Sequence, residues 1–178
     1  VYATMARIYH WKGNIENALL YANKVIESKQ LTFFDPSKEN KGNNSWDVAF
    51  YSESIFSLNK EEIQDVYSKR FDKLENTVLY NQKTDIESLY EITAGKSTDY
   101  RFEWAWYLYN DPNSNYERYK YYRYNPSVAK YPKLVTLIRL SEMYYIAAEI
   151  IAKRGAVNSA VDLLCAVNFS PNTYENYR

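Results

Sequence analysis

The chain has 178 residues, and its 22 Lys and Arg balance 22 Asp and Glu, so its net charge at pH 7 is zero. This balance argues against a nucleic-acid partner, which would need basic residues concentrated on one face. One Cys (Cys165) and one His (His10) exclude an internal disulfide, a multi-thiolate zinc site and a cluster of imidazole ligands. The four Gly residues lie far apart along the chain, which excludes a Gly-rich phosphate-binding loop. We therefore expect neither a metal nor a nucleotide cofactor.

Aromatic residues are unusually abundant, with 20 Tyr, 7 Phe and 4 Trp making up 17% of the chain. Such a chain either packs many rings in its core or displays them for binding. The mean hydropathy of −0.59 is low, and no apolar stretch reaches the length of a membrane span. The sequence opens inside an expected helix without a signal peptide, so we expect it to be part of a longer chain.

A helical hairpin is predicted at the start of the chain, with helices over 1–12 and 15–28. Gly13 lies where a helix end favours a left-handed residue, and Asn14 can cap the next helix. The apolar residues of the second helix recur every three or four positions, which predicts one buried stripe. They are Ile15, Ala18, Leu19, Ala22, Val25 and Ile26.

The same pattern returns near the end of the chain. An apolar helix is predicted over Leu137–Lys153, ended by Gly155, with a partner helix over 157–168. Aligning Gly13 with Gly155, 142 residues later, matches Ala6 with Ala148 and Ala18 with Ala160. Small residues at these places let two helices approach closely, as in tetratricopeptide hairpins, although the wide spacing separates the hairpins by an insertion.

The insertion between the hairpins is irregular. We predict a surface loop, three short strands, and helices over 60–79 and from a capping box at Thr84–Glu87 to about Ile92. The loop spans Asp35–Asp47, and the strands span Ser54–Leu58, Asp99–Tyr109 and Tyr116–Tyr124. The predicted fold class is mainly α, with tetratricopeptide-like hairpins and a partly β insertion. We expect a single domain over 1–178, made of a hairpin at 1–29, the insertion at 30–132 and a hairpin at 133–170.

Four blocks of sequence carry a resemblance to a known family. They are Ala6–Asn14 followed by Ala18–Ile26, Glu53–Asn59, Asp99–Phe102, and Leu137–Glu149 with the following Gly155, Ala160 and Leu163–Asn168. Their order and spacing resemble the SusD/RagB family of outer-membrane nutrient-binding lipoproteins of the Bacteroidetes. The lipid-bearing N-terminal Cys of that family is missing, and so is its closing region after the last helix pair, so the resemblance is to an internal portion.

The resemblance implies a SusD-like fold and a binding protein rather than an enzyme. Such a protein sits on the outer membrane through a lipid anchor absent from this sequence. It captures oligosaccharide for import through a TonB-dependent, SusC-like transporter, as part of polysaccharide utilisation. Three alternatives stay open: peptide capture as in the RagB branch, an intracellular tetratricopeptide-type scaffold, and a glycoside hydrolase.

Ligand residues cannot be carried over from the family, because they lie outside its matched motifs. Chemistry suggests Trp46 in the Asn-rich loop and Trp104 and Trp106 on a predicted strand, because sugar faces stack on aromatic rings. Asn44 and Asp47 could bond sugar hydroxyl groups. The alternative for each Trp is a structural role, as a loop anchor or as part of the core.

The other notable side chains are expected to be structural. We predict a packed or capping role for His10 and a small buried role for Cys165. Arg139 and Glu142 are expected to form an ion pair or hydrogen bonds, and no carboxylate pair is expected to be catalytic. Four hairpin rings fall at core-like positions and are expected to be buried: Tyr2, Tyr9, Tyr21 and Tyr144.

Overall fold

The computed structural model of the chain describes residues 1–35, 46–47, 49–63, 83–92, 106–108, 116–118, 129–131 and 133–168. The chain forms two compact units. The first contains Val1–Lys38, Ala49–Leu58 and Leu134–Arg178, and the second contains Glu39–Val48 and Asn59–Lys133. Each unit is described by itself below.

The first hairpin forms as predicted. It consists of α1 (Tyr2–Trp11) and α2 (Ile15–Glu27). Gly13 between them has φ of 73°, a left-handed conformation that a residue without a Cβ adopts at no steric cost. The side chain of Asn14 caps α2 by accepting a hydrogen bond of 3.1 Å from the backbone N–H of Asn17.

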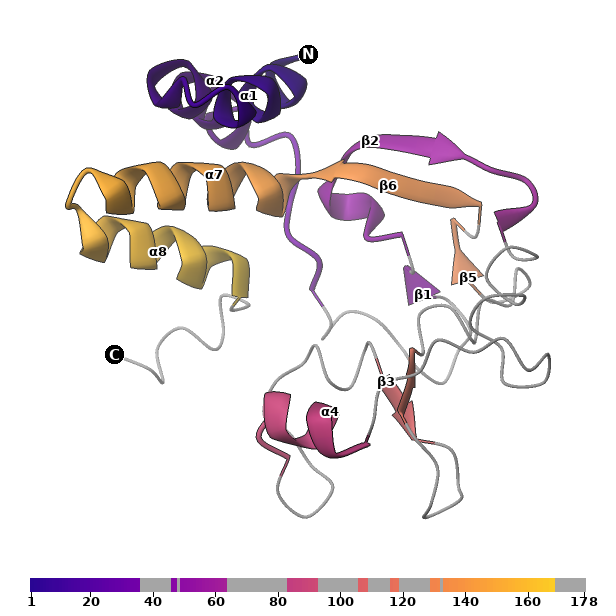
Figure 1. Cartoon of the computed structure of the whole chain (residues 1–178). Helices are drawn as coiled ribbons and strands as arrows, with labels where there is room; N and C mark the ends of the chain where they lie inside the picture. Colours follow the sequence, from indigo (N-terminus) through magenta and orange to yellow (C-terminus); the bar gives the residue numbers. More distant parts are fainter. Residues whose placement is uncertain are drawn as a thin grey trace. The chain divides into compact units, whose positions relative to one another are not determined.

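The last hairpin consists of α7 (Leu140–Lys153) and α8 (Val157–Asn168), with Gly155 at φ of 87° between them. The prediction that the first of these helices begins at Leu137 is wrong. Residues Leu134–Arg139 form strand β6, which runs directly into α7 and pairs with β2 (Ser54–Asn59) (Figure 1). β2 confirms the strand predicted at Ser54–Leu58, and it follows a 3₁₀ turn, η2 (Tyr51–Glu53).

Small residues bring the helices of the first unit together. α7 lies between the α1–α2 pair and α8, and it contacts all three helices (Figure 1). The faces where α1 and α2 meet α7 carry alanines that are at most 2% exposed, and α7 adds larger apolar side chains. The core consists of Ala3, Ala6, Ala18, Ala22, Ile138, Met143, Ile146, Ala147 and Ile150. Alanine allows close helix packing, and α7 contributes the larger core side chains Met143, Ile146 and Ile150.

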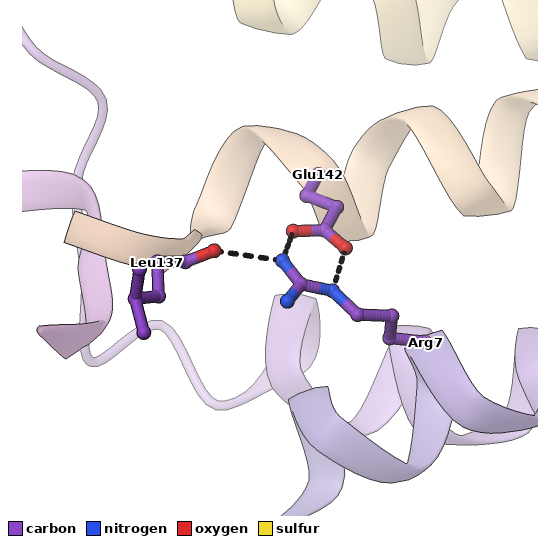
Figure 2. A network of polar contacts seen from close by, with 3 residues as sticks. All are labelled: Arg7, Leu137 and Glu142. Carbon is purple, nitrogen blue, oxygen red and sulfur yellow. Dashed lines mark hydrogen bonds and ion pairs between the residues drawn. The ribbon is translucent and has the colours of Figure 1, made fainter.

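One polar network ties α1 to the junction between β6 and α7. Arg7 binds both carboxylate oxygens of Glu142, with Nε 2.5 Å from Oε1, and also donates to the Leu137 carbonyl oxygen at 2.7 Å (Figure 2). The hydrogen bond to Glu142 raises the pKa of the Arg7 guanidinium. The structural role expected for Glu142 is confirmed, but its partner is Arg7 of α1. Arg139 instead lies over the Phe50 ring, 5.4 Å from its centroid.

Two further ion-pair groups link helices at the surface of the first unit. Arg154, after α7, pairs with Glu16 of α2 at 2.5 Å. Glu149 of α7 pairs with Lys153 one turn later, and its Oε2 lies 3.0 Å from Nε2 of His10 on α1. The hydrogen bond from Lys153, and to a lesser extent the nearby His10, lowers the pKa of Glu149.

The second unit contains short elements. Parallel strands β1 (Trp46–Asp47) and β5 (Ala129–Lys130) form one pair, and antiparallel strands β3 (Trp106–Leu108) and β4 (Tyr116–Arg118) form another. Helix α4 spans Lys83–Leu89 and buries Ile86. It begins before Thr84, so Thr84 lies inside the helix and is not its cap. Ile63 is also buried, but most of the helix predicted over 60–79 lies outside the described residues.

β3 and β4 fall inside the two aromatic strands predicted around the turn at 110–115. The remaining residues of both predicted strands lie outside the described part of the chain. The prediction of a single domain with boundaries at 29, 132 and 170 stays a prediction.

The contacts of Arg7 predict that Arg7→Leu lowers the free energy of unfolding more than Arg154→Leu does. Arg7→Leu should lower the free energy of unfolding by about 1 to 3 kcal/mol, because it leaves Glu142 and the Leu137 carbonyl without their donor. The control Arg154→Leu removes the more exposed pair with Glu16 and should cost less than about 1 kcal/mol. Urea unfolding monitored by circular dichroism measures both. Equal costs would contradict a special role for Arg7.

The lowered pKa of Glu149 predicts a pH-dependent contribution to stability. A carboxylate whose pKa is lower in the folded state stabilises the fold above its unfolded pKa, and that contribution is lost as the pH falls through the folded pKa. Glu149 is 45% exposed, so Glu149→Gln should cost at most about 1 kcal/mol at pH 7. The difference from the unsubstituted chain should shrink as the pH falls and vanish once the pH lies below the pKa of Glu149 in the folded protein. Glu27→Gln, an exposed carboxylate at the end of α2, serves as the control, and a cost of Glu149→Gln that does not change with pH would refute the assignment.

Candidate functional site

The candidate residues Trp46 and Asp47 form strand β1. Trp46 lies opposite Ala129 and Asp47 opposite Lys130 in a parallel register. The prediction that Trp46 and Asp47 lie in a surface loop is therefore wrong, because their backbone forms a strand. Their pairing partner is more than 80 residues away in sequence, so local turn residues such as Asn43 and Asn44 gave no sign of it. The side chain of Asp47 is partly buried.

A second candidate, Trp106, begins strand β3. It lies opposite Arg118 in an antiparallel register, and Tyr107 lies opposite Glu117. Trp106 and Arg118 thus hold opposite positions on neighbouring strands. Trp104 and Asn44 lie outside the described residues. The ligand role of all five candidates stays a prediction.

The tyrosines of the two hairpins are less buried than predicted. Tyr2 is 49% exposed, which contradicts its expected burial, and Tyr9, Tyr21 and Tyr144 are half-buried. The Tyr21 ring stacks on Tyr2 at 5.9 Å and on Tyr9 at 5.6 Å between centroids. Tyr2 and Tyr9 are seven residues apart on α1, so Tyr21 of α2 inserts between two rings that lie two helical turns apart. The three tyrosines therefore hold the hairpin together from its edge rather than from its core.

Two further side chains of the first hairpin, Lys24 and Trp11, lie outside its core. Lys24 places its ammonium group 5.0 Å from the Tyr2 centroid and 5.3 Å from the Tyr21 centroid. Trp11, at the end of α1, is 84% exposed. Trp11 was not among the predicted candidates, although it shares a helix face with Ile8 and lies off the stripe formed by Ala3 and Ala6.

The remaining titratable groups form structural contacts. His10 contacts Glu149, so it packs at a helix end as predicted, and among the described residues no three His, Cys, Asp or Glu side chains are placed to hold a metal ion. Cys165 is a free thiol that is only partly buried. Burial raises the pKa of Tyr144, whose ring meets Phe33 edge-on at 4.9 Å. Glu142 and Glu149 are both ion-paired, which suits structural roles for these carboxylates.

No helix in the described part of the chain is both long and apolar enough to span a membrane. No protein-family model matches the sequence, and no curated protein matches it either. Among solved structures, the chain is similar to a SusD superfamily protein from Bacteroides vulgatus. The two share a TM-score of 0.64 and 20% sequence identity, over 92% of this chain and 38% of the other.

This chain thus spans less than half the length of the structure it resembles. The likeness confirms the predicted fold class: the described residues are mainly helical, with short strands between two hairpins. The chain has a SusD-like fold.

Proposed function

We propose that this chain is part of a non-catalytic nutrient-binding protein on the outer-membrane surface. In this proposal the protein captures oligosaccharide and passes it to a TonB-dependent transporter of the SusC type. A lipid anchor outside this sequence would hold it at the membrane. The observation that carries the proposal is the SusD-like fold, which extends over 92% of the chain.

The composition of the second unit supports a carbohydrate ligand. Three of the four tryptophans, Trp46, Trp104 and Trp106, belong to it, and amide and acidic residues such as Asn44 and Asp47 accompany them. Rings stack on the apolar faces of sugars, and amides and carboxylates bond their hydroxyl groups. The fold also favours nutrient capture over a tandem tetratricopeptide scaffold, because strands and a long insertion separate the two hairpins.

Peptide capture, as in the RagB branch, is the second candidate function. The observation that favours it is the pair of exposed strand residues Phe56 and Leu58, which are 51% and 49% exposed on β2. Aromatic and apolar surface of this kind also suits peptide side chains. A direct comparison of the two ligand classes therefore decides between them.

Calorimetric titration provides that comparison. The purified chain is titrated with maltohexaose, cellohexaose and xylohexaose, and separately with a defined mixture of unstructured hexapeptides. We expect at least one hexasaccharide to bind with a dissociation constant between about 1 μM and 1 mM. Binding of peptides alone would favour the RagB-type function, and binding of neither class would refute nutrient capture by this part of the chain.

Substitution of the candidate tryptophans tests where the sugar binds. Trp46→Ala, Trp104→Ala and Trp106→Ala should each weaken binding of that hexasaccharide by about ten- to a hundredfold, as loss of a stacked ring costs about 1 to 3 kcal/mol. The melting temperature should stay within about 2 °C of the unsubstituted value, because a ligand-facing ring leaves no core cavity. Trp11→Ala, which removes an 84% exposed ring from α1, should change neither quantity. A sharp fall in melting temperature for a candidate would show that its ring belongs to the core.

A further inference from the structure

The two helical hairpins of the first unit are stacked repeats of one sequence pattern. α7 lies between the α1–α2 pair and α8 (Figure 1). The offset of 142 residues that aligns Gly13 with Gly155 makes α7 the equivalent of α1, and α8 the equivalent of α2. In a stack of repeats, each hairpin contacts its neighbours through the same positions. The contact between α2 and α7 therefore identifies the positions of α1 and α8 that would contact a further hairpin.

The face of α7 that packs with α2 is buried. Three of its apolar residues are at most 1% exposed and share one cluster with Ala18 and Ala22 of α2. They are Met143, Ala147 and Ile150. Arg154 follows one turn later on the same side and pairs with Glu16 of α2. The α2–α7 contact thus combines an apolar stripe with an ion pair at its end.

α1 displays the stripe that α7 buries. The equivalent positions, 142 residues earlier, are Val1, Met5, Ile8 and Lys12. Ile8 is 47% exposed and Met5 is partly buried, and Trp11 beside them is 84% exposed. Lys12 is exposed and keeps the positive charge of Arg154. We call Met5, Ile8 and Trp11 the α1 stripe.

α8 displays the positions that α2 buries against the same cluster. On α2, Ala22 is fully buried and Leu19 packs against the cluster. The equivalent residues of α8 are Leu164, which is 37% exposed, and Val161, which is 48% exposed. Val157, one turn before Val161, is 57% exposed. We call these three residues of α8 the α8 stripe. The outer face of a terminal repeat is normally polar, so apolar stripes at both outer faces indicate contact surfaces.

We propose that the α8 stripe is a docking surface for the α1 stripe of a second copy of this chain. The contact would continue the α2–α7 interface, with α8 in the place of α2 and α1 of the second copy in the place of α7. The repeat identifies this occupant, because α1 is the α7 equivalent that the chain itself carries. The two copies use different faces, so the contact is head-to-tail and extends from copy to copy without closing at a dimer. This proposal does not depend on the proposed function.

Charge at this contact predicts how it can be strengthened. The equivalents of Arg154 and Glu16 are Lys12 on α1 and Asn158 on α8, so the cation is present but the carboxylate is not. Asn158→Glu should supply the missing partner and tighten association by about two- to threefold at low salt. The gain should disappear when Lys12→Gln is added to the same chain.

Sedimentation velocity of the purified chain measures the association. The weight-average mass should rise above the monomer value of 21.1 kDa as the concentration increases. We expect this rise between about 10 μM and 1 mM, as for a small interface. Ile8→Lys and Val161→Lys each place a charge in one stripe and should stay monomeric. Leu20→Lys, at a 48% exposed position of α2 outside both stripes, is the matched control and should associate like the unsubstituted chain.

A mixture of two variants tests the head-to-tail arrangement. Ile8→Lys keeps its α8 stripe and Val161→Lys keeps its α1 stripe, so an equimolar mixture should form a dimer and no larger species. Melting temperatures close to that of the unsubstituted chain confirm that both variants are folded. A monomeric unsubstituted chain over the whole concentration range would overturn the proposal. So would association that survives in either variant alone, or a mixture that stays monomeric.

Discussion

The bond from Arg7 to Glu142 is the interaction on which the arrangement of the first unit depends. It joins residues 135 positions apart and reaches both sides of the point where β6 becomes α7, because Arg7 also bonds the Leu137 carbonyl. The alanine-lined faces of α1 and α2 allow close approach to α7, but smooth faces of small side chains do not define how far one helix slides along another. A bidentate Arg–carboxylate pair has directional geometry, so the bond from Arg7 to Glu142 defines the position of α1 along α7.

The sequence predicted those parts of the fold that local chemistry determines. Gly13 and Gly155 occupy left-handed positions and Asn14 caps α2, so the two hairpins were predictable from their own residues. The start of α7 was not. Leu137 and Ile138 fit a helical apolar pattern, and only pairing with β2, some 80 residues earlier, holds them in a strand. The same reason explains Trp46, whose strand pairs with Ala129.

Candidate residues were harder to predict than elements, because sequence cannot distinguish a displayed ring from a packed one. Tyr2 was expected in the core, yet it is half-exposed and stacks at the edge of the hairpin. Trp11 was not singled out, yet its side chain is 84% exposed. Similarly, Glu53 belongs to the block Glu53–Asn59, one of the four that carry the family resemblance. Its bond to the Phe34 backbone N–H follows only from the three-dimensional contacts.

We propose that the tryptophans of the second unit, rather than Trp11 of the first hairpin, contact an oligosaccharide. Nuclear magnetic resonance of the four indole N–H signals tests this proposal, with each signal assigned by single Trp→Phe substitution and the protein titrated with the hexasaccharide that binds. We expect the signals of Trp46, Trp104 and Trp106 to shift with saturation while that of Trp11 stays in place. A shift confined to Trp11, or no shift while calorimetry reports binding, would contradict it.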